Sequence, residues 1–225
     1  KREEAEGIAS FELVRAGGGE LPDFSPGAHI DVHVPGGIVR QYSLCNPSLQ
    51  KHRYQIAVLR DPQSRGGSEA MHGQVAEGDL LRISAPRNHF PLQADAGHSL
   101  LLGGGIGITP MMCMAEQLAR AADSFELHYC TRSRSRTAFY DSLRESHYFD
   151  KVHFHFDDED VAQRLDIGQK LATCPSDTHL YVCGPKGFMD AVIGKARELG
   201  WPESRIHWEY FGAEVVHKTD DESFE

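Results

Sequence analysis

The chain has 225 residues, of which 40% are hydrophobic, and a formal net charge of -10 at pH 7. This length can form one large domain or two small ones with separate cores, and we expect two. The acidic charge argues against nucleic acid as the main partner, because binding to phosphates needs a basic surface.

No apolar segment reaches the roughly 18 residues that a membrane-spanning helix needs, and the charged start lacks the apolar core of a signal peptide. We therefore expect a cytoplasmic protein. The 13 histidines show no metal-ligand spacing, so no metal site is expected. No disulfide framework or iron-sulfur site is expected either, since the cysteines are scattered at Cys45, Cys113, Cys130, Cys174 and Cys183.

Up to about residue 95, the chain consists of short segments typical of β-strands. Turn residues at 17–19, 35–37 and 77–79 separate them. Strands are expected at residues 9–15, 29–34, 39–45, 54–59 and 80–85. This regular spacing predicts a small antiparallel barrel or sandwich over residues 1–95.

The pattern then changes to strands that alternate with helices. Strands are expected at residues 99–102, 125–130, 152–156 and 179–183, and helices at 110–122, 139–145 and 185–199. This alternation is typical of a parallel sheet with helices on both faces, so residues 96–212 are predicted to form a Rossmann-like α/β domain. Residues 213–225 are acidic with little apolar content, which indicates a linker.

A glycine cluster at residues 103–107 links the first strand of this half to its first helix. We expect Thr109 to cap that helix and Pro110 to be its first residue. Glycines let a ligand approach the backbone, while free N–H groups and the helix dipole face an anion such as a pyrophosphate. The pattern favours a dinucleotide ligand. A purely structural turn is the alternative, because the third glycine of the common fingerprint is absent.

Two more strand ends reach the same edge of the predicted sheet. Arg132, Arg134 and Arg136 suit the adenosine ribose or phosphate of a nucleotide, or form a solvated loop. The turn at Cys183-Gly184-Pro185 has small side chains that would admit a flat ring, or it only caps a helix. We expect these loops to line one crevice with the glycine cluster.

The β half has its own candidate anion site. In Arg65-Gly66-Gly67-Ser68 the serine is expected to cap a short helix, so that N–H groups, a hydroxyl and a guanidinium converge on one phosphate. Arg40 and Tyr42 share one face of a strand, where Tyr42 could stack on a planar ring. Ser43, on the other face, could donate a hydrogen bond at the edge of that ring.

In this order, residues 40–44 (Arg-Gln-Tyr-Ser-Leu), 65–68, 103–110, 183–185 and 209–212 (Glu-Tyr-Phe-Gly) resemble the ferredoxin-NADP reductase superfamily. Within it they are most similar to the phthalate dioxygenase and vanillate O-demethylase reductase components. The resemblance covers nearly the whole chain. It implies a six-stranded antiparallel Greek-key β-barrel that binds flavin, followed by a Rossmann-like domain that binds a nicotinamide nucleotide.

The resemblance further implies FMN, since Arg-Gly-Gly-Ser is the pattern of the FMN-binding branch, and NADH, with NADPH also possible. The residues implied to hold FMN are Arg40, Tyr42, Ser43, Ala57, Val58, Arg65, Gly66, Gly67 and Ser68. Those implied to bind the nicotinamide nucleotide are Gly105, Gly107, Ile108, Thr109, Pro110, Thr131, Arg132, Ser133, Gly184, Pro185 and Met189.

Four residues are implied to serve the hydride transfer itself. Ser43 would lie near flavin N5, and the turn at Cys183 would receive the nicotinamide. Glu209 would stabilise charge or relay a proton, and Phe211 would cover the flavin where the nicotinamide enters.

Such reductases usually continue into a ferredoxin domain whose four cysteines hold a 2Fe-2S cluster, and the required cysteine run is absent here. The expected function is therefore that of a truncated or naturally two-domain reductase component. It would pass single electrons from NADH to a 2Fe-2S centre and on to a Rieske-type aromatic oxygenase or demethylase. The alternatives are a free-standing flavin reductase, a reductase of another acceptor, and a non-catalytic flavin- or nucleotide-binding regulatory subunit.

Overall fold

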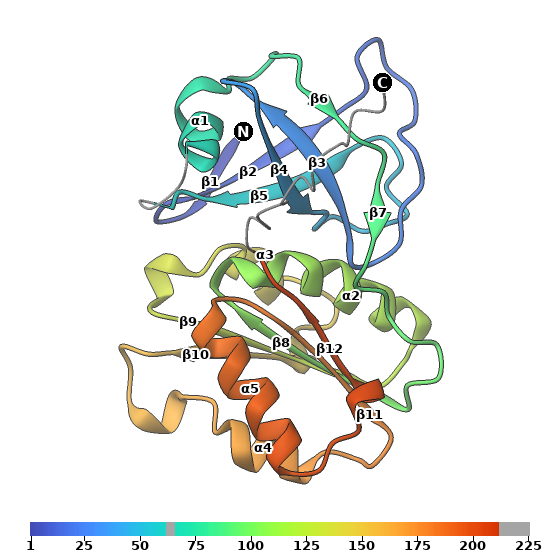
Figure 1. Ribbon diagram of the computed structural model, residues 1–225, viewed down its shortest axis with the longest axis vertical. Coiled ribbons are helices and arrows are strands. Elements are labelled where there is room, and N and C mark those ends of the chain that lie inside the picture. The colour runs from blue at the N-terminus through green and yellow to red at the C-terminus, as the bar shows by residue number, and fades with distance from the viewer. Residues whose placement is uncertain (62–65, 212–225) are drawn as a thin grey trace, which may run out of the picture.

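The structure is a computed structural model that describes residues 1–61 and 66–211. Its first half is built from antiparallel strands and its second half from a parallel sheet with helices. The two halves lie one above the other in Figure 1, with the change of architecture between β7 (Arg87–Asn88) and β8 (His98–Gly104).

Two antiparallel sheets make up the first half. One has the strand order β1 (Arg2–Ala5), β2 (Ile8–Leu13), β5 (Tyr54–Leu59). The other has the order β4 (Ile38–Ser43), β3 (Ala28–Val34), β6 (Arg82–Ile83), and β7 also pairs with β3. The expected antiparallel barrel is confirmed. Seven strands stand where six were implied, and β6 and β7 have only two residues each.

Alternating side chains fill the core of this barrel. On β3, Ile30, Val32 and Val34 are buried inside it, while Asp31 and His33 point outward. Helix α1 (Gly67–Gln74) packs on the same core through Ala70 and Met71. The outward face at the start of β3 is therefore available for the second half of the chain.

The second half has five parallel strands in the order β10 (Val152–Phe156), β9 (Phe125–Thr131), β8, β11 (Thr178–Cys183), β12 (Ile206–Glu209). Strand β8 is buried on both faces: Leu101 packs in the cluster with α2 (Ile108–Ala121), and Leu100 and Leu102 pack in the cluster with α5 (Lys186–Glu198). The predicted Rossmann-like arrangement is confirmed. The remaining helical segments are α3 (Tyr140–Arg144), α4 (Ile167–Thr173) and the short 3-10 turns Gly105–Gly107, Arg134–Arg136, Phe149–Lys151, Val161–Gln163 and Glu203–Arg205.

Both predicted helix caps are wrong. Helix α2 begins at Ile108 after Gly107, so Thr109 lies inside the helix and its hydroxyl donates to the carbonyl of Ile106. Helix α1 follows Gly66, whose φ of +92° is in the left-handed region that glycine tolerates. A backbone turn made by glycine replaces the side-chain cap in each case.

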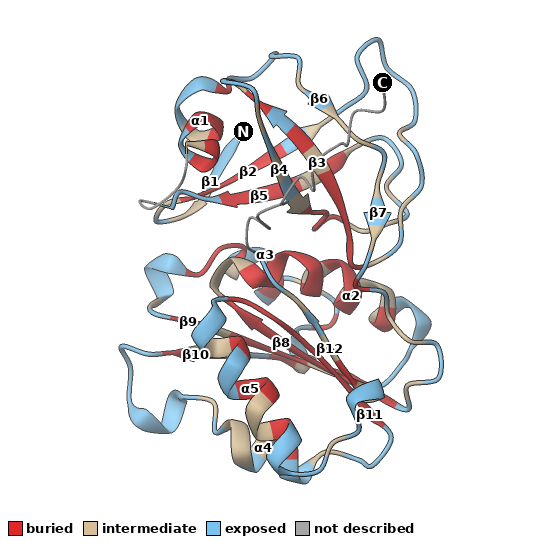
Figure 2. Cartoon of the chain, in the orientation of Figure 1, coloured by how far each residue is buried: buried red, intermediate tan, exposed pale blue. Residues whose placement is uncertain are grey.

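A shared hydrophobic cluster joins the two halves. Phe90 and Ala57 from the barrel half lie in the same buried cluster as Met111 and Met114 of α2. Gly27 contacts Phe90 so closely that an added Cβ would lie 1.9 Å from its carbonyl oxygen. Figure 2 shows the buried colour of α2 where it faces the barrel. The halves thus pack directly on each other, which places strand ends of both at one junction.

Candidate functional site at the junction of the two halves

Ser43 and Glu209 meet at this junction from opposite halves of the chain. Ser43 is the last residue of β4, and its hydroxyl donates to Glu209 Oε2 at 3.3 Å. Glu209 is the last residue of β12, and its other oxygen, Oε1, lies 3.5 Å from His29 Nδ1. One carboxyl group therefore faces two neighbouring barrel strands.

Cys183 lies beside Glu209, because the two residues are partners in the register of β11 and β12. Its side chain is fully buried. Burial, and next the Glu209 carboxylate, raise the pKa of the Cys183 thiol well above its usual range. Cys183 is therefore a neutral thiol at neutral pH, which suits contact with a flat apolar ring better than nucleophilic attack.

Arg40 and Tyr42 lie on one face of β4, as the strand pattern predicted. Tyr42 is half-buried, and burial raises its pKa to about 12, against the opposing effect of Arg40. Arg40 lies across the first residue of α1: a Cβ added at Gly67 would come within 2.7 Å of Arg40 Nε. A guanidinium and the N-terminal N–H groups of an eight-residue helix thus converge where the sequence predicted a phosphate.

Only part of the predicted phosphate loop lies within the described residues. Ser68 is buried, and its Oγ accepts a hydrogen bond from the N–H of Asp61 at 3.2 Å. Gly66 and Gly67 form the turn into α1. Arg65 lies outside the described residues, as does Gly212 at the end of the fifth motif.

The glycine turn after β8 packs directly on the turn at Cys183. A Cβ at Gly107 would lie 2.2 Å from the carbonyl oxygen of Cys183, and one at Gly104 would lie 3.0 Å from Pro185 Cδ. A Cβ added at Gly184 would lie 2.9 Å from the Cα atom of Gly104. Gly105, by contrast, has φ +52° and open space around it. The two turns form one surface, and Gly105 offers bare backbone to a ligand there.

The third strand end, after β9, carries the predicted adenosine-binding residues. The hydroxyl of Thr131 is buried in a hydrogen bond of 2.7 Å with Thr137, so it is already used inside the protein. Arg132 is exposed. Arg134 lies over the ring of Tyr140 and Arg136 pairs with Glu6 at 2.8 Å, which ties this loop to the barrel half. The hydroxyls of Ser133 and Ser135 form a hydrogen bond with each other, 3.0 Å between their Oγ atoms.

Comparison with known proteins now defines the family. Residues 83–206 match the family described as dimethylamine monooxygenase subunit DmmA-like, N-terminal domain. The chain is 55% identical to vanillate O-demethylase oxidoreductase of Pseudomonas putida, over 100% of this chain and 70% of that protein. The chain belongs to this family of oxygenase reductases.

Solved structures agree with this assignment. Phthalate dioxygenase reductase, described as a modular structure for electron transfer from pyridine nucleotides to [2Fe-2S], superposes with a TM-score of 0.88 at 41% identity, covering 96% of this chain and 67% of that one. An intact type IV self-sufficient cytochrome P450 monooxygenase superposes with a TM-score of 0.88 at 39% identity, covering 94% of this chain and 27% of that one.

The predicted enzyme class, an NAD(P)H-dependent flavin oxidoreductase that acts as an electron-transfer component, is confirmed for this oxygenase reductase. None of its described helices is both long and apolar enough to cross a membrane.

Several of the predicted ligand-binding side chains are buried in the core, among them Ile108, which is 0% exposed in the cluster that joins the halves. Val58 is 1% exposed in the barrel core, so only its backbone is available to border a ligand. Met189 is wholly buried in the cluster beneath α5, and Ala57 lies in the cluster that joins the halves. Phe211, by contrast, is 43% exposed, so its ring is not part of the buried core.

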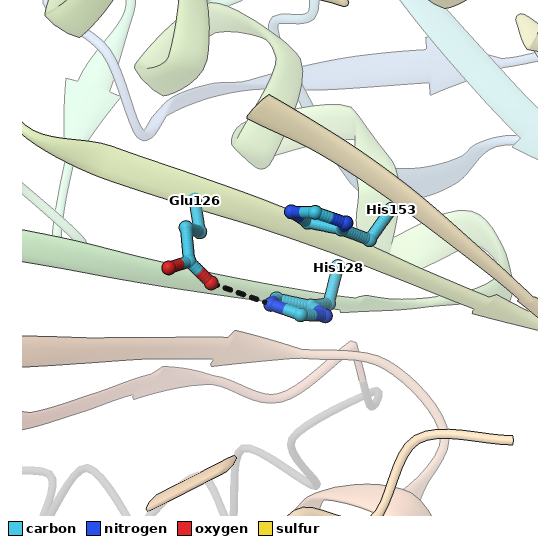
Figure 3. Close-up of side chains that lie close together, drawn as sticks. All are labelled: Glu126, His128 and His153. Atoms are coloured by element: carbon cyan, nitrogen blue, oxygen red, sulfur yellow. Dashed lines mark hydrogen bonds and ion pairs between the residues drawn. The ribbon is translucent and has the colours of Figure 1, made fainter. Parts of the chain in front are cut away.

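A separate cluster of possible metal ligands lies on β9 and β10. The ligand atoms of Glu126, His128 and His153 lie within 4.8 Å of one another, and Figure 3 shows the two imidazoles one above the other. Glu126 already receives the ammonium of Lys170, and His128 Nδ1 lies 3.0 Å from His155 Nε2. The ammonium of Lys170 already neutralises the Glu126 carboxylate, whose negative charge a metal cation would need. This cluster lies away from Ser43.

His29 is a residue at the junction that the sequence analysis missed. The signal was present in the hairpin. In a hairpin whose turn is centred on Gly36, two residues face each other when their numbers add up to 72, so His29 should lie opposite Ser43. The observed register of β3 and β4 has this pair.

Proposed function

We propose that this oxygenase reductase is FMN-dependent, oxidises NADH, and passes single electrons to a 2Fe-2S centre that serves a Rieske-type aromatic oxygenase or demethylase. The observation that supports this most directly is the meeting of Ser43, Cys183 and Glu209 at the junction of barrel and parallel sheet. A flavin on the barrel and a nicotinamide on the sheet would face each other only there.

The barrel offers a site that fits the phosphate of FMN. Arg40 lies against Gly67 at the first turn of α1, so that a side chain at Gly67 would displace it. Arg40, Gly66, Gly67 and Ser68 would hold the phosphate, together with Arg65. Tyr42 would pack on the ring, as a half-buried aromatic side chain at the edge of the barrel core can.

The sheet offers a site that fits a dinucleotide. The backbone at Gly105 and Gly107 precedes α2, a helix of 14 residues whose positive end would face a pyrophosphate. Arg132 and Ser133 would meet the adenosine end, and Cys183, Gly184 and Pro185 the nicotinamide. Arg134 and Arg136 contact Tyr140 and Glu6, so a 2′-phosphate would have to compete with these contacts, which supports NADH over NADPH.

When bound, the flavin would supply the step from two-electron to one-electron chemistry. The chain's own residues prepare the site. Phe211 would move aside to admit the nicotinamide, the neutral thiol of Cys183 would lie against its ring without reacting, and Ser43 and Glu209 would hold a proton at the ring edge. The buried cluster between the halves would keep both rings in register.

As part of the same proposal, residues 1–95 are the FMN domain, 96–212 the NAD domain and 213–225 a linker toward a 2Fe-2S ferredoxin domain. The partners are then this ferredoxin domain, in cis or as a separate protein, and the terminal oxygenase, with the whole system in the cytoplasm. Neither nucleic acid nor membrane takes part.

A second candidate is supported by the match to the P450 monooxygenase. The same reductase module could serve a haem acceptor instead of a Rieske-type centre. The two candidates share FMN and NADH and differ only in the final acceptor.

The test is an anaerobic absorbance spectrum of the purified chain before and after one equivalent of NADH, followed by release and identification of the flavin. Flavin bands that bleach, with FMN released, are the expected result. A flavin that NADH does not bleach would instead indicate a non-catalytic binding subunit. Mixing the reduced protein with a plant-type ferredoxin or with a P450 haem domain then separates the two acceptors.

A further inference from the structure

His29 is buried beside the junction without a hydrogen-bond partner for either ring nitrogen among the described residues. Its exposure is 4%, and both Nδ1 and Nε2 lack a partner at hydrogen-bond geometry. Burying a polar group without a hydrogen bond destabilises the folded state, so its presence here calls for an explanation. The nearest acceptor is Glu209 Oε1, 3.5 Å from His29 Nδ1.

Glu209 is approached from two sides. Ser43 and His29 are direct cross-strand neighbours, and each faces a different oxygen of the same carboxyl group. A carboxylate held by a donor at both oxygens keeps its orientation, whereas one held at a single oxygen is free to rotate. Glu209 is 17% exposed at its side chain, so without His29 it has room to turn toward solvent.

Few other titratable groups face His29. From β11, the Cys183 thiol lies next to Glu209. After β7, the exposed ring of His89 lies 5.4 Å from the His29 ring. Arg87, its register partner on β7, pairs with Asp31 instead. Among the described residues, Glu209 is therefore the nearest acceptor that faces His29.

We propose that His29 is a positioning residue for Glu209: its Nδ1–H donates to Oε1 and so holds Oε2 toward the Ser43 hydroxyl. The proposal deepens the proposed function and rests on it for its consequence in catalysis. The pairing itself is a property of the chain without any ligand.

The first experiment therefore needs no flavin. At neutral pH, the imidazole N–H signals of the flavin-free chain are recorded by NMR, and the His29 signal is identified as the one missing in H29N. This N–H is expected to exchange with water about tenfold faster in E209A, because the carboxylate that accepts its hydrogen bond is gone. An unchanged exchange rate would overturn the pairing. His98, whose Nδ1 lies 2.8 Å from Ser124 Oγ, is identified through H98N and is the control whose exchange must not change.

The second experiment tests the role in turnover of the flavin-loaded protein. H29L removes the donor, and H29N keeps a donor near the position of Nδ1 but cannot titrate. H29L is expected to lower kcat for NADH oxidation with ferricyanide by about tenfold, with KM for NADH nearly unchanged. H29N is expected to restore kcat.

Two results would contradict the role in turnover: wild-type kcat in H29L, or an equal loss in H29L and H29N. Thermal melting of each variant shows whether it is folded, and the NMR exchange rate stands as the second measurement if H29L is not. A wild-type chain that binds no flavin or does not oxidise NADH would contradict the proposed function instead, while the NMR result would still decide the His29–Glu209 pairing.

Discussion

Gly107 packs so closely on Cys183 that a Cβ atom added at Gly107 would lie 2.2 Å from the Cys183 carbonyl oxygen. The contact joins the turn after β8 to the turn after β11, and with them the two predicted parts of the nicotinamide-nucleotide site. No flexible side chain can move aside here, because the atom in the way belongs to the backbone.

G107A is therefore expected to force these turns apart and to lower the free energy of unfolding by about 2 kcal/mol. Urea unfolding measures this change. The matched control is G194A in α5, where a Cβ would meet nothing within 4 Å and where alanine favours the helix by up to about 1 kcal/mol. Equal stability of G107A and the wild type would show that the turns have room to separate.

R40A is expected to weaken FMN binding by about 1.5 to 3 kcal/mol, because it removes a charge-assisted hydrogen bond to the phosphate beside α1. Fluorescence titration of FMN measures the dissociation constant. Arg82 is exposed on β6, and R82A should bind FMN as the wild type does. Unchanged affinity in R40A would remove Arg40 from the phosphate site.

The wild type is expected to prefer NADH to NADPH in kcat/KM, and R134A is expected to keep that preference. Arg134 lies over the ring of Tyr140, 4.6 Å from guanidinium carbon to ring centroid, so its charge is engaged in a cation–π contact. Steady-state rates with both nucleotides decide the point. A preference for NADPH that disappears in R134A would assign the 2′-phosphate to this arginine.

Stability is expected to fall as the pH falls below neutrality, partly through His128. Burial, the largest effect, lowers the pKa of His128 to about 4, although Glu126 opposes this. The unfolded chain takes up that proton near pH 6.5, so it binds more protons than the folded chain between these values, and acid favours unfolding. From pH 7 to pH 5 this one group costs about 2 kcal/mol.

H128N should therefore show a weaker dependence of unfolding free energy on pH between these values than the wild type, whatever its absolute stability. H33N, which changes an exposed histidine, should keep the full dependence. The acid effect of Glu126 is separate: burial raises its pKa, but the hydrogen bonds from Lys170 and His128 outweigh this and hold it at about 2. Its contribution is lost only as the pH falls below about 4.5.

The sequence by itself determined the two architectures and most of the chemistry-bearing turns. The barrel strands alternate apolar and polar residues because only one of their faces is buried. Strand β8 is a continuous apolar run because both of its faces are buried, so the two patterns distinguish an antiparallel barrel from a parallel sheet. The strands β1, β7 and β12 and the helix α4 were not predicted, since short segments carry too little periodicity.

Only the tertiary structure decided which residues meet. Ser43 and Glu209 are 166 residues apart in the chain, and the hydrogen bond between them exists because the two halves pack through a shared core. The same packing buries His29 beside Glu209 and turns Met189 and Val58 into core residues. Local patterns define elements, but the relative placement of two domains depends on contacts between residues distant in sequence, and no local pattern contains them.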